Sequence, residues 1–265
     1  MESKAMLHRI EPDHSVLDQI TIAREPAELL SQFFLKAVEA AANRGVTLEF
    51  ATFEDLLAAN QANSDTWRPI TTSFRSDIGG ASNSTGLVVF GRDHHGEIVA
   101  TQATRLFDWH DTHFKDEAES LRFFYADPDR DKGAGEQCIV TAPDASEVTG
   151  AIVLSGAIWY RPDFRGAGLA NIIPRFIRTC SYLQWDLDEF IAIVTSENVA
   201  KAFDKRTGLP APTRSVILRN HPTIPDGDLE TLLSRLTPAQ LIDDLATFVA
   251  DYPVEPDVRV EPRRA

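Results

Sequence analysis

The sequence predicts a mixed α/β fold for residues 46 to 220. Apolar runs of strand length recur along this part of the chain, and segments with a helical stripe of apolar residues separate them. Of the 265 residues, 43% are apolar and 25% are charged, which is typical of a globular protein with a substantial core. The expected strands are 46–50, 86–90, 97–107, 138–141, 151–160, 190–195 and 214–219.

The N-terminal part, residues 1–45, is expected to be an extension of the core. Residues 1–24 lack periodicity and form an arm. Glu25 and Pro26 then open a helix, because proline is favoured in the first helical turn. Its apolar stripe is Leu29, Leu30, Phe33, Phe34, Ala37 and Val38. Asn43-Arg44-Gly45 ends this helix.

The first half of the core shows a strand, a helix, a long loop and a hairpin. Thr52 and Asp55 have capping-box spacing and predict a helix after strand 46–50. Residues 60–85 are polar and rich in Ser, Thr, Asn and Gly, so they form a long loop, and such loops are often functional. Residues 93–96 read as the turn of a hairpin. A weak helix is expected around residues 118–125.

The C-terminal part, residues 221–265, is expected to be a helical extension with a mobile tail from Pro253. Two sets of apolar residues have helical spacing and predict one or two helices over residues 227–251. The first set is Leu229, Leu232, Leu233 and Leu236, and the second is Leu241, Ile242, Leu245, Phe248 and Val249.

The charge and the cysteines restrict the class of protein. A net charge of −14 disfavours nucleic acid and anionic membranes as partners. No run of about 18 apolar residues and no secretory signal occurs, so a cytoplasmic protein is expected. Cys138 and Cys180 lie in apolar surroundings and are interpreted as buried thiols.

The most informative segment is the turn Arg165-Gly166-Ala167-Gly168-Leu169-Ala170, which follows an apolar strand and opens a helix. Two glycines let successive amides face an anion, and the start of a helix leaves further N–H groups unpaired. A diphosphate group could bind to these amides. Pro174 lies inside the helix, and a later start with Asn171 as the N-cap is the alternative.

These residues resemble the GNAT superfamily of acyl-CoA N-acyltransferases. The family signature is Gln or Arg, two residues, Gly, one residue, then Gly or Ala, and Arg165, Gly168 and Ala170 occupy these places. The preceding residues 159–164, the strand 190–195, Asn198 and the Gly208-Leu209 ending are also similar to the family. The resemblance implies a three-layer fold with a twisted, mostly antiparallel sheet. It further implies that a bulge near Gly156 parts two parallel strands so that the pantetheine arm passes between them.

The resemblance also implies roles for individual residues. The expected acyl-CoA-binding residues are Tyr160 through its backbone, Arg165, Gly166, Ala167, Gly168, Leu169, Ala170 and Asn198. The family tyrosine that protonates the leaving thiolate is replaced by Asp204 here. The family asparagine falls on Glu197, unless one residue is inserted, in which case Asn198 takes its place. Tyr160, Asp204 and Glu197 are therefore the candidate catalytic residues.

Acyl transfer, most simply acetyl transfer, from CoA to a primary amine by direct attack is the expected reaction. The alternative is a domain of the same fold that senses acyl-CoA or docks a partner without turnover. Arg161, Arg165, Lys201, Lys205 and Arg206 could offset the acidic charge near the carrier. Dinucleotide binding is disfavoured because Asn171 stands where a third Gly or Ala is needed.

The acceptor site is expected to be shaped by the loop 60–85 and the segment 108–131. The acidic charge favours a cationic acceptor such as a polyamine, an aminoglycoside or a lysine side chain. Asp108, His110, Asp111 and His113 are interpreted as a polar loop, with an acceptor-gripping role and a metal site as the alternatives. No metal is expected, and a homodimer contact through the helical extensions is possible.

Overall fold

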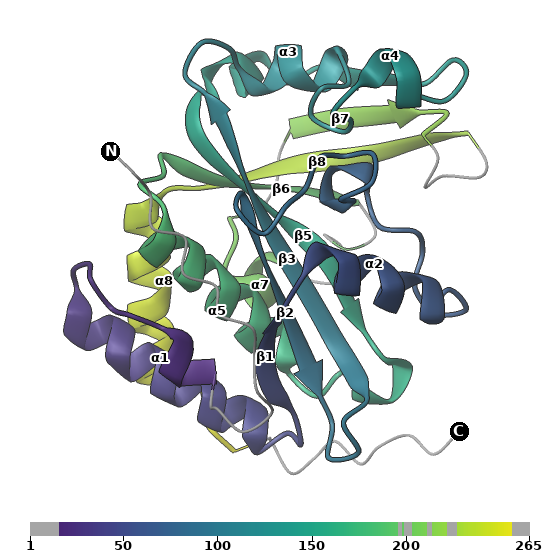
Figure 1. The fold of residues 1–265 in the computed structure, drawn as a ribbon. Helices are drawn as coiled ribbons and strands as arrows, with labels where there is room; N and C mark the ends of the chain where they lie inside the picture. The colour runs from purple at the N-terminus through teal and green to yellow at the C-terminus, as the bar shows by residue number, and fades with distance from the viewer. Residues whose placement is uncertain (1–15, 196–197, 199–202, 211–213, 222–226, 256–265) are drawn as a thin grey trace.

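The fold is built on one mixed sheet, to which eight strands of the described chain contribute. A computed structural model describes residues 16–195, 198, 203–210, 214–221 and 227–255. The strand order is β1-β2-β3-β5-β6-β8-β7-β4 (Figure 1). The bounds are β1 Thr47–Ala51, β2 Gly86–Arg92, β3 Ile98–Trp109, β4 Gln137–Val140, β5 Gly150–Tyr160, β6 Glu189–Thr195, β7 Arg214–Arg219 and β8 Asp228–Leu236.

Helices cover both faces of the sheet, so the three-layer α/β arrangement is confirmed. All neighbouring strands pair antiparallel except β5 and β6, which are parallel. One face carries α1 Ala27–Ala42, α5 Leu169–Gln184 and α8 Pro238–Asp251, and the other carries α2 Phe53–Ala62 and α3 Phe114–Glu119 (Figure 1). Shorter elements are α4 Pro128–Asp131, α7 Phe203–Thr207 and the 3₁₀ turns Val16–Gln19, Thr72–Phe74, Pro143–Glu147 and Pro162–Phe164.

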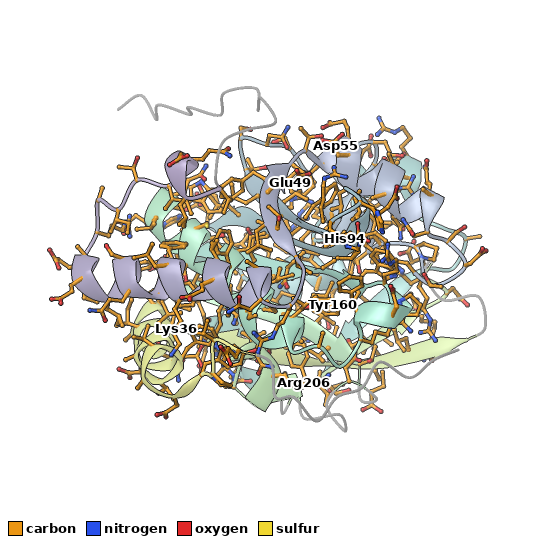
Figure 2. All side chains as sticks on the ribbon, turned by 90° about the horizontal axis from the view of Figure 1, so that it is seen from below. Lys36, Glu49, Asp55, His94, Tyr160 and Arg206 are labelled. Atoms are coloured by element: carbon orange, nitrogen blue, oxygen red, sulfur yellow. The ribbon has the colours of Figure 1, made fainter. Side chains whose placement is uncertain are left out.

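The N- and C-terminal helices pack together against α5. Phe33 of α1 meets Phe248 of α8 with ring centroids 5.4 Å apart, and Phe34 meets Phe176 of α5 at the same distance. The ammonium of Lys36 donates to the carbonyl of Val249 at 2.7 Å, joining α1 to α8 (Figure 2). The predicted N-terminal helix is thus confirmed, and it shares its core with the C-terminal helix.

The local signals of the first half of the core are confirmed. The Thr52 hydroxyl accepts from the amide of Asp55 at 3.0 Å, and the Asp55 carboxylate accepts from the amide of Thr52 at 3.1 Å. This capping box begins α2. Strands β2 and β3 form the predicted hairpin, with Gly96 at a positive φ of 82° in its turn.

The helix predicted over residues 227–236 is wrong, because these residues form strand β8. This strand lies between β6 and β7 and pairs antiparallel with both. Leu233 and Ser234 are buried in succession, so the alternation of buried and less buried residues along the strand is interrupted there. A strand covered on both faces loses the period of two, and its leucines then mimic a helical stripe. The second predicted helix is confirmed as α8, which Thr237 and Gln240 begin with a capping box.

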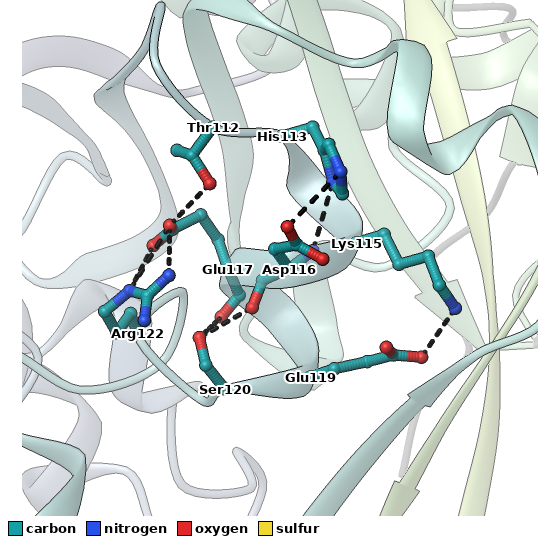
Figure 3. A network of polar contacts seen from close by, with 8 residues as sticks. All are labelled: Thr112, His113, Lys115, Asp116, Glu117, Glu119, Ser120 and Arg122. Carbon is teal, nitrogen blue, oxygen red and sulfur yellow. Dashed lines mark hydrogen bonds and ion pairs between the residues drawn. The ribbon is translucent and has the colours of Figure 1, made fainter.

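The weak helix predicted around residues 118–125 lies earlier in the chain. The helix is α3, which ends at Glu119, and Leu121 has a positive φ of 66° that stops any continuation. His113 is the N-cap, and its ring accepts from the amide of Asp116 at 3.2 Å. Glu117 accepts from Thr112 at 2.9 Å and from Arg122 at 2.7 Å (Figure 3). These contacts close the turn after α3.

Replacing Glu117 by glutamine should destabilise the protein by about 1 kcal/mol, measured by urea unfolding at neutral pH. The side chain of Glu117 is 11% exposed but Arg122 is 55% exposed, so solvent screens part of the ion pair. The hydrogen bond from Arg122 lowers the pKa of Glu117 below its ordinary value. The stabilisation is therefore present above the unfolded pKa of about 4.3 and is lost as the pH falls through the lower folded value.

The gap between wild type and Glu117→Gln should therefore shrink in acid. The control is Asp129→Asn, because the side chain of Asp129 is 97% exposed and contacts Lys132 at 3.3 Å on the surface. A gap that stays constant down to the acid unfolding limit would contradict the ionic role of Glu117.

Both cysteines are free and buried, as predicted. Burial raises the pKa of the Cys138 thiol to about 12, and that of Cys180 is raised further by the same cause. These thiols are unreactive at neutral pH. Among the helices of the described chain, none combines the length and the hydrophobicity that a membrane crossing needs.

Candidate active site

The parallel strands β5 and β6 separate in the middle of the sheet. They pair only from Ile152 to Leu154 of β5, opposite residues 189–191 of β6. On its other edge β5 carries a bulge, because Gly156 lies opposite Ala103 while Trp159 lies opposite Thr101. Ala157 in this bulge has a positive φ of 52°. The bulge predicted near Gly156 is confirmed, and beyond Leu154 the edge of β5 that faces β6 is unpaired.

A cavity of about 790 Å³ lies where the strands part. It is lined by residues 66–71, by residues 155–160 of β5, by the turn and first residues of α5, by residues 192–195 of β6, and by α7. Trp67 and Trp159, whose rings stack 5.2 Å apart, belong to the apolar cluster on the α2 side. Leu169 and Phe203 belong to the cluster on the α5 side. The cavity therefore passes through the sheet from one face to the other.

The glycine turn stands at one end of this cavity and leads directly into α5. Gly166 and Gly168 have φ values of 88° and 86°, in the left-handed region that L-residues avoid. The helix begins at Leu169 with Gly168 as the N-cap, so the late start at Asn171 is wrong. Pro174 is accommodated within the helix, where it removes only the hydrogen bond to the carbonyl of Ala170.

The backbone amides of the turn form a set of unpaired donors. Within the described chain, the amides of Gly166, Gly168, Leu169 and Ala170 donate to no acceptor. The amide of Ala167 donates to Phe164 at 3.3 Å. Unpaired amides at a helix N-terminus, with the positive end of the helix dipole behind them, form an anion site.

The cavity is also cationic, although the protein is acidic. Arg68, Arg165 and Arg206 line it, and no Asp, Glu or His is among its described lining residues. The Arg165 guanidinium donates to the carbonyls of Tyr160 at 3.0 Å and Thr66 at 3.2 Å, which joins the turn to the long loop. The Arg165 side chain therefore connects the end of β5 to the loop at Thr66, and it also contributes a positive charge to the cavity.

Arg161 is not among the described residues that line the cavity. Arg161 pairs with Asp93 and Asp163, each at 2.8 Å, so its contribution to a carrier site was predicted wrongly. Lys201 and the side chain of Lys205 lie outside the described residues.

Tyr160 lines the cavity but its hydroxyl is buried on the α5 side. The hydroxyl makes no hydrogen bond in the described chain, and burial raises its pKa well above the ordinary value. The charges of Arg206 and Arg178 act on this pKa in the opposite direction. The phenol of Tyr160 is therefore protonated at neutral pH.

Arg178 is a buried residue near the site that sequence reasoning missed. It is fully buried on α5 and donates to the carbonyl of Thr207, which lines the cavity. Burial lowers the pKa of this guanidinium to about 9. No local signal marks the residue, since its neighbours Ile177 and Thr179 are ordinary for a buried helix.

The remaining predicted site residues lie in the segment after β6. Asn198 is exposed and lines the cavity, and its amide donates to the Thr195 hydroxyl at 3.4 Å. Glu197 lies outside the described residues. Asp204 belongs to α7, and its side chain is likewise outside the described part. The catalytic roles of Glu197 and Asp204 stay predictions.

The two segments expected to shape the acceptor site differ in position. The loop 60–85 contributes residues 66–71 to the cavity, whereas the segment 108–131 contributes none of the described lining. Asp108 and His110 instead form an exposed pair, with 2.6 Å between carboxylate and ring nitrogen. In the described chain no group of three or more His, Cys, Asp or Glu could hold a metal ion. Asp108 lies in strand β3, His110 in the turn that follows it, and His113 caps α3.

No family model matches the sequence, and no curated protein matches it either. The solved structures that the chain resembles in fold include an aminoglycoside acetyltransferase and a spermidine N-acetyltransferase. NAA60 of Arabidopsis thaliana in complex with acetyl-CoA is 13% identical, with 73% of this chain and 99% of that chain covered and a TM-score of 0.45.

Two further structures are similar at the same level. RimJ of Mycobacterium smegmatis in complex with CoA-disulfide is 14% identical, covering 76% of this chain and 88% of that one at a TM-score of 0.44. Spermidine N-acetyltransferase of Vibrio cholerae is 10% identical, with coverages of 74% and 95% and a TM-score of 0.43. At these identities and TM-scores the similarity concerns shape, and the reaction of this chain has to be argued from its own site.

Proposed function

We propose that this protein transfers an acyl group from acyl-CoA to a primary amine. The observation that supports this most directly is the set of unpaired amides in the glycine turn, at the end of a cavity that runs between parted parallel strands. A carrier with a diphosphate at one end and a long amide-bearing arm at the other matches both features. The turn would hold the diphosphate, and the unpaired edge of β5 would bind the amides of the arm.

The cavity offers a route for each substrate. The arm would enter from the α5 side, where the turn, Leu169 and Phe203 lie, and its thioester would reach the region of Ser155 and Ala192. The amine would approach from the α2 side, past Trp67 and Trp159. Direct attack needs the amine nitrogen to meet the thioester carbon, and a cavity lined from both faces of the sheet would let the two substrates meet from opposite sides.

Two proton transfers accompany the attack. The amine nitrogen attacks the thioester carbon, loses a proton to a base, and the carbon–sulfur bond breaks to release a thiolate that must be protonated. Tyr160 holds its proton at neutral pH and is a candidate acid for the thiolate. Glu197 and Asp204, in the segment that borders the cavity, are the candidate bases, either directly or through water.

Acetyl is the simplest acyl group for this reaction, and a cationic amine is the favoured acceptor. The excess of carboxylates over basic residues, 40 against 26, attracts polyamines, aminoglycosides and lysine side chains. Arg165 and Arg206 line the cavity beside the glycine turn and α7, where they would face the carrier.

The proposed function is tested by measuring thiol release from acetyl-CoA across a panel of primary amines that includes polyamines, aminoglycosides and lysine peptides. We expect turnover with at least one amine, together with mass-spectrometric detection of the acylated amine in equal amount. Thiol release without an acylated amine would indicate hydrolysis and would overturn the transfer.

A second candidate, an acyl-CoA sensor without turnover, is favoured by one observation. No Asp, Glu or His of the described chain lines the cavity, so the described lining lacks a side-chain base at neutral pH. Tight acetyl-CoA binding with no product over the whole amine panel would support the sensor. Absence of any CoA binding would contradict both candidates.

A further inference from the structure

The outer side of the glycine turn is held by two residues from opposite ends of the chain. The Arg44 guanidinium, just after α1, donates to the carbonyl of Ala167 at 2.9 Å. The Tyr252 hydroxyl, just after α8, donates to the carbonyl of Gly168 at 3.2 Å. The two side chains also contact each other, with the Arg44 guanidinium 5.2 Å from the centre of the Tyr252 ring.

These contacts fix the directions of two amides. In a trans peptide the carbonyl and the N–H of the same peptide unit point in opposite directions. Holding the carbonyl of Ala167 therefore turns the amide of Gly168 away from Arg44. The carbonyl of Gly168 accepts from the amide of Asn171 at 3.0 Å and from its side chain at 3.3 Å as well as from Tyr252, and together these contacts turn the amide of Leu169 away from Tyr252. Both amides belong to the unpaired set, and both residues line the cavity.

The two residues are themselves held in place by the terminal segments. Arg44 also donates to the carbonyls of Ala40 at 2.7 Å and Val254 at 2.8 Å, so it joins the end of α1 to the chain after α8. The Tyr252 ring stacks on Phe248 with centroids 4.5 Å apart. A Cβ at Gly168 would lie 3.0 Å from the Tyr252 hydroxyl, so the contact on the turn is close.

We propose that Arg44 and Tyr252 are positioning residues that aim the amides of Gly168 and Leu169 at the diphosphate of the carrier. This inference rests on the proposed function, because it presumes a diphosphate in the cavity. It assigns the helical extensions a role in binding: they keep the donors of the turn aligned before the ligand arrives. Preorganised donors bind an anion without the loss of conformational entropy that a mobile turn would incur.

The test compares binding of acetyl-CoA with binding of acetyl-pantetheine, which ends before the diphosphate. Tyr252→Phe keeps the ring on Phe248 and removes only the hydroxyl. We expect its dissociation constant for acetyl-CoA to rise about 5-fold, the effect of one lost hydrogen bond. Arg44→Met should raise it about 10-fold or more, because a charged donor is lost. Binding of acetyl-pantetheine should be unchanged in both variants.

Arg24 and Tyr182 form a matched control pair in the same helical layer, which contains α1, α5 and α8. Arg24 lies 5.5 Å from the centre of the Tyr182 ring, and the Tyr182 hydroxyl donates to the carbonyl of Glu25 at 2.8 Å. Arg24→Met and Tyr182→Phe remove equivalent contacts away from the cavity. They should leave both dissociation constants as in the wild type. Arg44→Lys, which retains a charge that can reach the same carbonyls, should recover part of the lost affinity.

The outcomes separate this proposal from the proposed function. Wild type that binds neither acetyl-CoA nor CoA would overturn both. Wild type that binds acetyl-CoA, with Tyr252→Phe and Arg44→Met binding equally well, would overturn the positioning role alone. An equal loss for acetyl-CoA and acetyl-pantetheine would also overturn it, since a general loss of stability does not depend on the diphosphate.

Discussion

Replacing Gly168 by valine is expected to weaken acyl-CoA binding at least 100-fold. The backbone φ of 86° is strained for any residue with a Cβ and most strained for a β-branched one. The new Cβ would also lie 3.0 Å from the Tyr252 hydroxyl and 3.2 Å from Arg44 Nε. Relief of either strain rotates the peptide units whose amides form the anion site.

The loss is measured most simply as ligand-induced stabilisation. Acetyl-CoA at 100 times its dissociation constant should stabilise the wild type by about 2.7 kcal/mol, and a 100-fold weaker variant by only about 0.4 kcal/mol. Gly96→Ala is the control, because Gly96 has a similar φ of 82° with nothing within 4 Å of its Cβ position, and it lies in the β2–β3 turn. An undiminished ligand effect in Gly168→Val would refute the assignment of the turn as the anion site.

Replacing Asp244 by alanine is expected to destabilise the protein by about 3 to 5 kcal/mol, the cost of leaving a buried charge unpaired. Asp244 of α8 accepts two hydrogen bonds from Arg175 of α5, at 2.8 Å and 2.9 Å. Arg175 is only 7% exposed. It also donates at 2.8 Å to the carbonyls of Asn171 and Arg206, both of which line the cavity.

The loss should appear as a lower denaturation midpoint in urea with an unchanged slope, which indicates a change in stability alone. Asp243→Ala is the neighbouring control, since Asp243 is exposed and should change the free energy of unfolding by less than about 0.5 kcal/mol. Equal midpoints for the two variants would show that the Arg175–Asp244 pair does not hold α5 to α8.

Local sequence signals predicted most of the elements that build the site. Turn glycines, capping boxes and apolar stripes act over a few residues, so the glycine turn, α2, the β2–β3 hairpin and the bulge after Gly156 were all foreseen. Strand β8 was not foreseen. It pairs with β6 on one edge and β7 on the other, and its leucines at 229, 232, 233 and 236 have the spacing of a helical stripe.

Long-range contacts of the site could not be predicted. Arg44 and Ala167 are 123 positions apart, and Tyr252 and Gly168 are 84 apart, so no pattern within a window joins them. Arg161 was misassigned for the same reason, because its partner Asp93 lies 68 positions away in the β2–β3 turn. The sequence shows which residue types are present. Their contact partners depend on how distant elements pack against each other.

The insertion of β8 beside β6 has a consequence for synthesis of the chain. While only β1 to β6 have been synthesised, the β8-facing edge of β6 has no partner, since β8 comes after β7 in the chain. That edge carries apolar residues such as Phe190 and Val194. Open apolar edges pair readily with other nascent chains. The β8-facing edge of β6 therefore stays open until β8 has been translated.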